Sequence, residues 1–170
     1  MAARQYYYQS ATAEATTTAT ADTTVATLTF TPDDNSDYII LWSALSRGQS
    51  GINDSRVKLT QGTTATLNAI NMENSAALAT EVIAMYGAAV ATFGVAPGSQ
   101  NFLIRHSAEA GTTATSTQGV NIKDVHLIAI KLATSDAYFY ATATQSSTTS
   151  TSYQNAATLS FTPSATGSYL

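Results

Sequence analysis

Hydrophobic and polar residues alternate strictly in a short segment that occurs twice in this chain. The first copy spans residues 26–32 (ATLTFTP) and the second spans residues 157–163 (ATLSFTP). Period-2 alternation is typical of a β-strand with one buried face, and proline ends such a strand because it has no N–H to donate to the sheet. The segment therefore predicts a strand that stops at Pro32 and a repeat of that strand that stops at Pro163.

The surroundings of the two copies have the same spacing. Phe30 and Phe161 are 131 positions apart (161 − 30), and Tyr38 and Tyr169 are separated by the same distance (169 − 38). Each of these tyrosines follows the proline of its copy by six residues. Equal spacing of strand, stop and aromatic residue predicts tandem copies of one domain.

The repeat divides the chain into three parts. Residues 1–22 are predicted to be an N-terminal arm, a candidate anchor, or else an edge strand, and residues 23–134 a β-sandwich domain. Residues 135–170 are predicted to be the start of a second, incomplete copy, and two strands without the rest of their sheets are not stable alone. Either the natural chain continues into a full second module, which we favour, or these residues add strands to a neighbouring subunit.

The remaining pattern predicts further strands separated by turns. Residues 38–45 are apolar almost without a break, which is typical of a strand covered on both faces, and residues 120–132 place alternate side chains on opposite faces. Residues 72–80 are ambiguous and would tolerate a short helix. Eight or nine short strands predict an all-β fold, a two-sheet antiparallel sandwich, with a jelly roll favoured and an immunoglobulin-like sandwich second.

Composition and charge exclude several classes of protein. Charged residues make up only 11% of the chain, and the net charge of −4 leaves no basic stripe for nucleic-acid binding. The chain has no cysteine, which excludes disulfides and thiolate metal sites. It has no apolar run long enough for a membrane-spanning helix, and its first residues lack the apolar region of a Sec-type signal peptide. We therefore expect neither nucleic acid nor membrane as a partner.

The sequence contains no recognisable catalytic or metal-binding group. The only histidines, His106 and His126, have Glu109 and Asp124 nearby, but this spacing does not give a converging triad. The histidines lack a third metal ligand, and the acidic turn at 33–37 lacks the glycine and closing glutamate of a calcium loop. We predict a protein that is not an enzyme, with no catalytic residue, metal site or cofactor.

Two runs of aromatic residues are candidates for contact with a partner. Consecutive side chains on a strand point to opposite faces, so each run must expose a ring or bury it in an interface. Trp42, in contrast, lies in the apolar strand and is expected in the core. The predicted interface residues are Tyr6, Tyr7, Tyr8, Tyr138, Phe139 and Tyr140.

Three segments are the threonine-rich strand 23–31 with its Phe-Thr-Pro stop, residues 38–44 and the closing strand 121–132. Together they resemble modules of tailed-bacteriophage virion proteins. Head fibres, capsid decoration proteins and tail appendages are the relevant kinds, and the resemblance covers most of residues 5–134. It implies a non-enzymatic structural protein of the virion, made in the host cytoplasm. The implied partners are other copies of itself, as a trimer or another symmetric oligomer, and virion proteins such as the major capsid or tail protein. The alternative is a carbohydrate-binding, lectin-like β-sandwich module.

Overall fold

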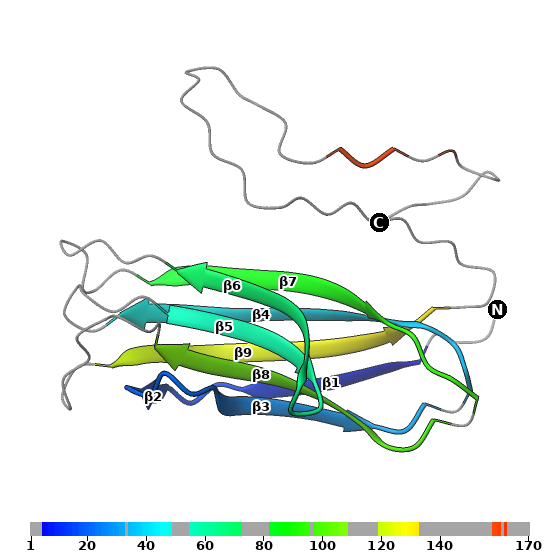
Figure 1. Cartoon of the computed structure of the whole chain (residues 1–170), viewed down its shortest axis with the longest axis horizontal. Helices are drawn as coiled ribbons and strands as arrows, with labels where there is room; N and C mark the ends of the chain where they lie inside the picture. The colour runs from blue at the N-terminus through cyan, green and yellow to red at the C-terminus, as the bar shows by residue number, and fades with distance from the viewer. Residues whose placement is uncertain are drawn as a thin grey trace. The chain divides into compact units, whose positions relative to one another are not determined.

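The computed structural model (Figure 1) describes residues 5–32, 34–48, 55–72, 82–95, 97–108, 119–132, 158–160 and 162. The chain divides into two compact units, Met1–Thr134 and Ser135–Leu170, each of which is described by itself. The described part of the first unit is built from β-strands. These are β1 (Tyr6–Ala11), β2 (Ala15–Thr17), β3 (Thr23–Phe30), β4 (Tyr38–Gly48), β5 (Ser55–Gln61), β6 (Ala65–Met72), β7 (Ile83–Ala91), β8 (Gln100–Ala108) and β9 (Val120–Lys131).

The strands form two antiparallel sheets. Sheet A has the order β1-β9-β4-β7, with β2 also paired to β9, and sheet B has the order β3-β8-β5-β6. The pairs are nested, because β1 pairs with β9, β3 with β8, β4 with β7 and β5 with β6. This nesting of early strands with late ones across two sheets is the strand order of a jelly roll. The predicted all-β two-sheet sandwich is confirmed, and its strand order is that of the favoured jelly roll.

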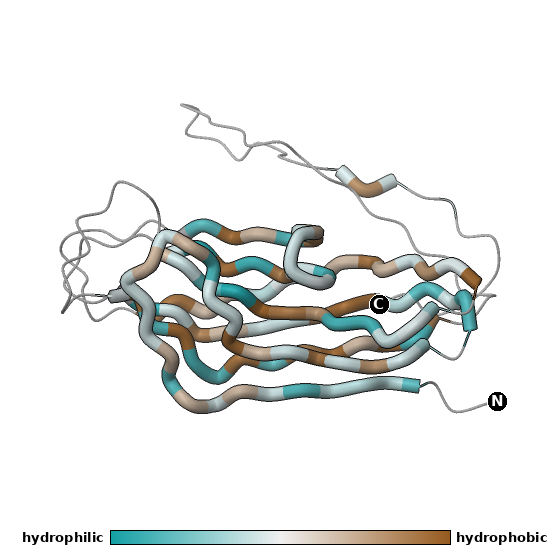
Figure 2. Tube along the Cα trace, turned by 60° about the horizontal axis from the view of Figure 1, so that its bottom comes forward, coloured by the Kyte–Doolittle hydropathy of each residue, from teal (hydrophilic) through white to brown (hydrophobic). Residues whose placement is uncertain are grey.

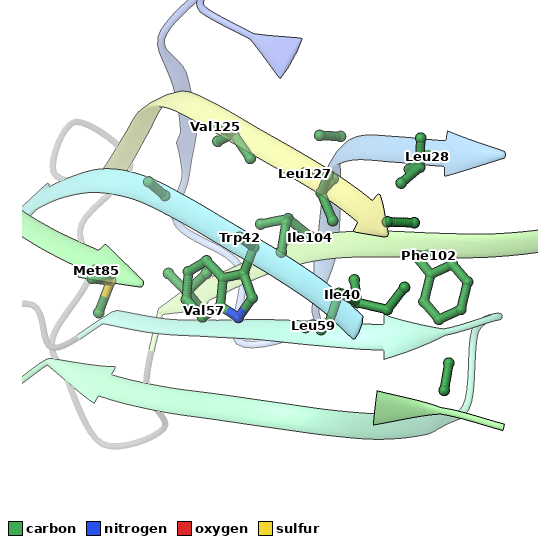
Figure 3. Close-up of a cluster of buried hydrophobic side chains, with 14 of the residues drawn as sticks. Leu28, Ile40, Trp42, Val57, Leu59, Met85, Phe102, Ile104, Val125 and Leu127 are labelled. Carbon is green, nitrogen blue, oxygen red and sulfur yellow. The ribbon is translucent and has the colours of Figure 1, made fainter. Parts of the chain in front are cut away.

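The hydrophobic core lies between the two sheets (Figure 3). Ile40 and Trp42 of β4 point into this space, as Leu59 of β5 and Ile104 of β8 do from the other sheet. All four side chains are at most 3% exposed, so Trp42 is a core residue as predicted. These side chains face inward because apolar and polar positions alternate along many of the strands, as Figure 2 shows. Removal of the apolar positions from water is the main term that stabilises the sandwich.

Phe30, the last residue of β3, lies at the centre of an aromatic cluster. Its ring stacks on Tyr7 at 4.4 Å between centroids and on Phe102 at 5.7 Å. Tyr38 and Phe93 contact it at 5.0 and 6.3 Å. Such aromatic pairs add to the stabilisation that buried area alone provides. The phenylalanine of the repeated segment therefore joins β1, β3, β4 and β8 at one point of the core.

Residues 6–17 form an edge of sheet A. β1 pairs with the second half of β9, and β2 pairs with the first three residues of that strand. Between β1 and β2, the Glu14 carboxylate accepts hydrogen bonds from Arg47 at 3.0 and 3.1 Å and from Asn121 at 2.9 Å. These bonds tie the interruption to β4 and β9, so in the described residues this part of the chain is an edge strand and not a free arm.

β4 corrects one expectation from the sequence. Its inward side chains, Tyr38, Ile40, Trp42 and Ala44, are buried, whereas the alternate residues from 39 to 45 are only half-buried. The strand is covered on one face, because sheet A packs on sheet B through that face alone. The apolar residues on its other face therefore need a different explanation from burial within the sandwich.

β7 runs without a break through Gly87. A Cβ atom at Gly87 would lie 2.5 Å from Trp42 Nε1 and 2.6 Å from Asn68 Oδ1. These distances are shorter than any Cβ contact tolerates, so only glycine fits. Gly87 lets the Trp42 indole lie close against the backbone of the neighbouring strand.

In the second unit the described residues are 158–160 and 162, and none of them lies in a strand. Leu159, the counterpart of Leu28 in the repeat, is 49% exposed, whereas Leu28 is 3% exposed. The leucine of the repeated segment is therefore a core side chain in the first unit and an exposed one in the second. The ambiguous residues 73–80 and the aromatic run 138–140 lie outside the described residues.

Candidate functional site

The side of sheet A that points away from sheet B carries mostly apolar residues. Residues directly opposed on neighbouring strands point to the same face, so the pairing registers align these side chains in rows across β1, β9, β4 and β7. The rows are Tyr6-Ile130-Ile39-Val90, Tyr8-Ile128-Leu41-Ala88 and Ser10-His126-Ser43-Tyr86. We call this set of residues the apolar face.

Tyrosines lie at both edges of the apolar face. On β1, Tyr6 is 72% exposed and Tyr8 is 51% exposed, and on β7, at the opposite edge, Tyr86 is 77% exposed. The aliphatic side chains between them, such as Leu41 and Ile128, are half-buried by their neighbours in the sheet. Aromatic residues around an aliphatic centre are the composition that protein interaction surfaces favour.

A hydrogen bond holds one of these tyrosines in place. The Tyr8 hydroxyl lies 2.8 Å from His126 Nδ1, and the two rings are stacked with centroids 6.1 Å apart. A side chain that is already fixed loses less conformational entropy when a partner binds. Tyr8 is therefore preorganised for contact.

The apolar face is large enough to be a binding surface. Four strands about 4.8 Å apart, with three rows about 6.8 Å apart, cover roughly 19 Å by 20 Å, or about 400 Å² in projection. Contiguous apolar patches of this size on soluble proteins commonly mark sites of interaction. No charged residue occurs in the three rows, and Lys123 pairs with Leu45 in the row beyond them.

The outer side of sheet B is polar by contrast. Thr27 and Thr29 of β3 are exposed, and the Thr29 hydroxyl donates a hydrogen bond of 2.7 Å to the Asn101 side chain. Arg105 of β8 and Lys58 of β5 are paired in register on the same side. The two outer sides of the sandwich therefore differ in chemistry, and only that of sheet A carries an apolar face.

Charged residues of sheet B cluster around Asp22. Its carboxylate lies 2.6 Å from Lys58 Nζ and 3.8 Å from Arg105, and it accepts a hydrogen bond of 3.1 Å from Ser107. Burial alone would raise the pKa of Asp22, but the hydrogen bonds from Lys58 and Ser107 and the two positive charges outweigh it and lower the pKa. This cluster joins the residue before β3 to β5 and β8, so its role is structural.

Comparisons with known proteins give no family for this chain. No family model matches it, and no curated protein matches it in sequence. Solved structures resemble it at low identity. Dimeric latent PorU from Porphyromonas gingivalis shares 8% identity at a TM-score of 0.48, over 75% of this chain and 12% of the PorU chain. This chain thus spans only a small part of the PorU chain.

Two other structures have similar levels of likeness. The carbohydrate-binding module CBM36 in complex with calcium and xylotriose shares 15% identity at a TM-score of 0.36, over 71% of this chain and 98% of that one. The structure of infectious bursal disease virus Gt strain shares 15% identity at a TM-score of 0.40, over 78% of this chain and 37% of that one. TM-scores below 0.5 assign no function, so the fold is defined by the strand order of this chain itself.

The structure separates the predicted interface residues. Tyr6 and Tyr8 lie on the apolar face, as the argument from consecutive side chains requires, whereas Tyr7 points inward and stacks on Phe30. Tyr7 is half-buried and packs against the core, and its predicted role in an interface stays a prediction. Tyr138, Phe139 and Tyr140 lie outside the described residues, and the prediction for them stays untested.

The sequence missed most of the apolar face. Its central and far residues come from β4, β7 and β9, and they are Ile39, Leu41, Ser43, Tyr86, Ala88, Val90, His126, Ile128 and Ile130. The signal was present in two strands, β4 and β9, where residues of both alternating sets are apolar. A strand with only one face in the core has polar residues at alternate positions.

The two histidines lie apart and have different surroundings. His126 is on the apolar face, whereas His106 is 1% exposed between the sheets, and burial lowers its pKa to about 4. Within the described residues, His106 Nε2 has no hydrogen-bond partner. Among those residues, no three of His, Cys, Asp or Glu converge as a metal group. The described part of the chain also contains no helix long and apolar enough to span a bilayer.

Proposed function

We propose that this chain is a non-enzymatic structural component of a bacteriophage particle, a capsid decoration, head-fibre or tail-associated protein. It binds other protein subunits through the apolar face of sheet A. The observation that carries the proposal is the difference between the two outer sides of the sandwich. On the outer side of sheet A, three rows without a charged residue form an apolar surface edged by Tyr6, Tyr8 and Tyr86, whereas the outer side of sheet B is polar.

The composition of the apolar face suits a protein partner. Its aliphatic centre gains free energy when water is removed from it, at roughly 25 cal/mol for each Å² of apolar surface. The tyrosines at its edges supply large contact area with a hydroxyl that can reach water or a partner. The phage assignment is supported by the resemblance of strand 23–31 and residues 38–44 to phage virion modules.

Carbohydrate binding is the second candidate function. The exposed rings of Tyr6, Tyr8 and Tyr86 favour it, because an aromatic ring can stack on the apolar side of a sugar. A sugar site also needs several placed polar groups. Ser10, Ser43 and His126 supply them in one row only, so we prefer a protein partner.

Incorporation into particles tests the proposed function. The tagged chain is produced in host cells while bacteriophage particles assemble. The particles are then purified on a density gradient, and the amount of the chain in them is measured by mass spectrometry. We expect the wild-type chain in the particle at a level comparable with the other structural proteins. Ala88→Arg places a charge in the middle row of the apolar face, on the exposed edge strand β7, and is expected to lower incorporation at least tenfold.

Thr27→Arg is the matched control, because Thr27 is also an exposed strand residue but lies on the outer side of sheet B. It is expected to incorporate like the wild type. Absence of the wild-type chain from purified particles would contradict the proposal. A rise in melting temperature with a sugar, lost in Tyr86→Ala, would support the carbohydrate alternative in its place.

A further inference from the structure

We propose that the partner of the apolar face is the same face of a second copy of this chain. This inference rests on the proposed function, because it names the subunit that the face binds. The two copies pack sheet A against sheet A, related by a twofold axis that is parallel to the strands.

Such an axis lays each row of one copy over the same row of the other, with the strand order reversed. β1 of one copy then lies over β7 of its partner, and β9 lies over β4. The row registers therefore fix which residues meet. Tyr6 meets Val90, Tyr8 meets Ala88, and Tyr86 meets Ser10.

These three contacts pair a large side chain with a small one in every row. The exposed tyrosines at one edge face Val90 and Ala88 at the other edge, and Tyr86 faces a serine. Sheet faces pack well when large and small side chains interdigitate across the interface. The face is therefore complementary to itself in shape. Binding to an unrelated protein would not need this property.

The centre of the face is also self-complementary. Under the same axis Ile130 meets Ile39, and Ile128 meets Leu41, so aliphatic side chains face aliphatic side chains. No charge is repeated across the contact, because the three rows contain none. Like charges placed opposite one another are the usual obstacle to such isologous pairing.

The area is sufficient for a specific dimer. The three rows of both copies cover about 800 Å² in projection. The accessible area of side chains exceeds their projection. Specific interfaces bury at least roughly 1,000 Å² in total, so the two faces reach the required size.

Sedimentation of the purified full-length chain tests the dimer. We expect the wild type and Thr27→Arg to associate as dimers in the micromolar range, and Ala88→Arg to have a dissociation constant at least 100-fold higher. Circular dichroism and the melting temperature confirm that each variant is folded. The inference is overturned if the wild type stays monomeric at about 100 μM, or if Ala88→Arg dimerises as the wild type does.

Chemical cross-linking tests the arrangement of the two copies. The chain has no cysteine, so Ser10→Cys and Ala88→Cys each introduce the only thiol, and neither change removes a tyrosine. Opposed sheets are about 10 Å apart, too far for a disulfide, so a bismaleimide that spans about 8 Å between sulfurs is used.

The proposed axis places residue 10 of one copy about 12 Å from residue 88 of the other, whereas like positions are about 17 Å apart. We expect efficient cross-linking only when the two variants are mixed. Efficient self-linking of either variant alone would overturn the arrangement. The assay needs only purified chain, so failure of self-association is distinguishable from failure of incorporation into particles.

Discussion

Leu28→Ala is expected to lower the free energy of unfolding of the sandwich by about 3 kcal/mol, while Leu159→Ala changes it by less than about 0.5 kcal/mol. Both leucines are the third residue of the repeated segment, so the substitution and its local sequence are matched. Leu28 is 3% exposed and packs in the core, whereas Leu159 is 49% exposed. Truncation of a buried leucine loses apolar contact and leaves a cavity, and truncation of an exposed one does neither.

Chemical denaturation of the two variants and the wild type, followed by tryptophan fluorescence, measures the difference. Trp42 is 3% exposed in the core of the sandwich, so its emission reports unfolding of this unit. Equal losses of stability for the two variants would show that the second copy of the segment is as well packed as the first. That outcome would contradict the structure at Leu159.

Acid is expected to destabilise the sandwich by about 3 kcal/mol between about pH 6.5 and about pH 4, through the buried side chain of His106. Burial lowers the pKa of His106 from 6.5 to about 4 in the folded state. The unfolded chain therefore binds a proton in this range that the folded chain does not, and stability falls as the pH falls. The contribution is fully present above pH 6.5 and is lost by about pH 4.

His106→Leu is the variant that isolates this effect, because it removes the titrating group and the Nε2 atom that has no partner among the described residues. Its stability is expected to be constant between pH 6.5 and pH 4.5. The carboxyl of Asp22 acts at lower pH, since its lowered pKa lies below the ordinary value of 3.8. Denaturant unfolding at several pH values measures both proteins, and an unchanged slope in His106→Leu would contradict the assignment to His106.

Much of the fold follows from local pattern. The alternation at residues 26–32 predicts β3 and its end, and the apolar run around Trp42 predicts the core strand β4. Alternation with a period of two residues directly indicates which side chains face inward. The interruption between β1 and β2 could not be predicted, since it depends on hydrogen bonds from Arg47 and Asn121, which are distant in the sequence, to Glu14.

The irregularity in β9 could not be predicted from the alternation of apolar and polar residues either. Asp124 has a φ of 49°, and the register of β9 on β4 shifts between Ser43 and Leu45. Bulges of this kind are usually marked by glycine in the left-handed region. Here an aspartate, which tolerates that region better than most residues, takes the place of glycine and removes the usual signal.

The apolar face was missed for a physical reason. An apolar side chain is drawn out of water equally by its own chain and by a partner, so periodicity does not separate the two cases. The apolar run 38–45 was interpreted as a strand buried on both faces, and the structure shows that only one face is covered by the sandwich. The tyrosines of β1 were found because three consecutive large rings cannot all face inward.

Hydroxyl-radical footprinting of the assembled protein tests the central claim most directly, because it reports which side chains lose contact with water. The account predicts that Tyr6, Tyr8 and Tyr86 are labelled in dilute monomer and protected on assembly, while Val95, which is 89% exposed and lies outside the apolar face, is labelled equally in both states. Unchanged labelling of the three tyrosines in the assembled state would contradict the account.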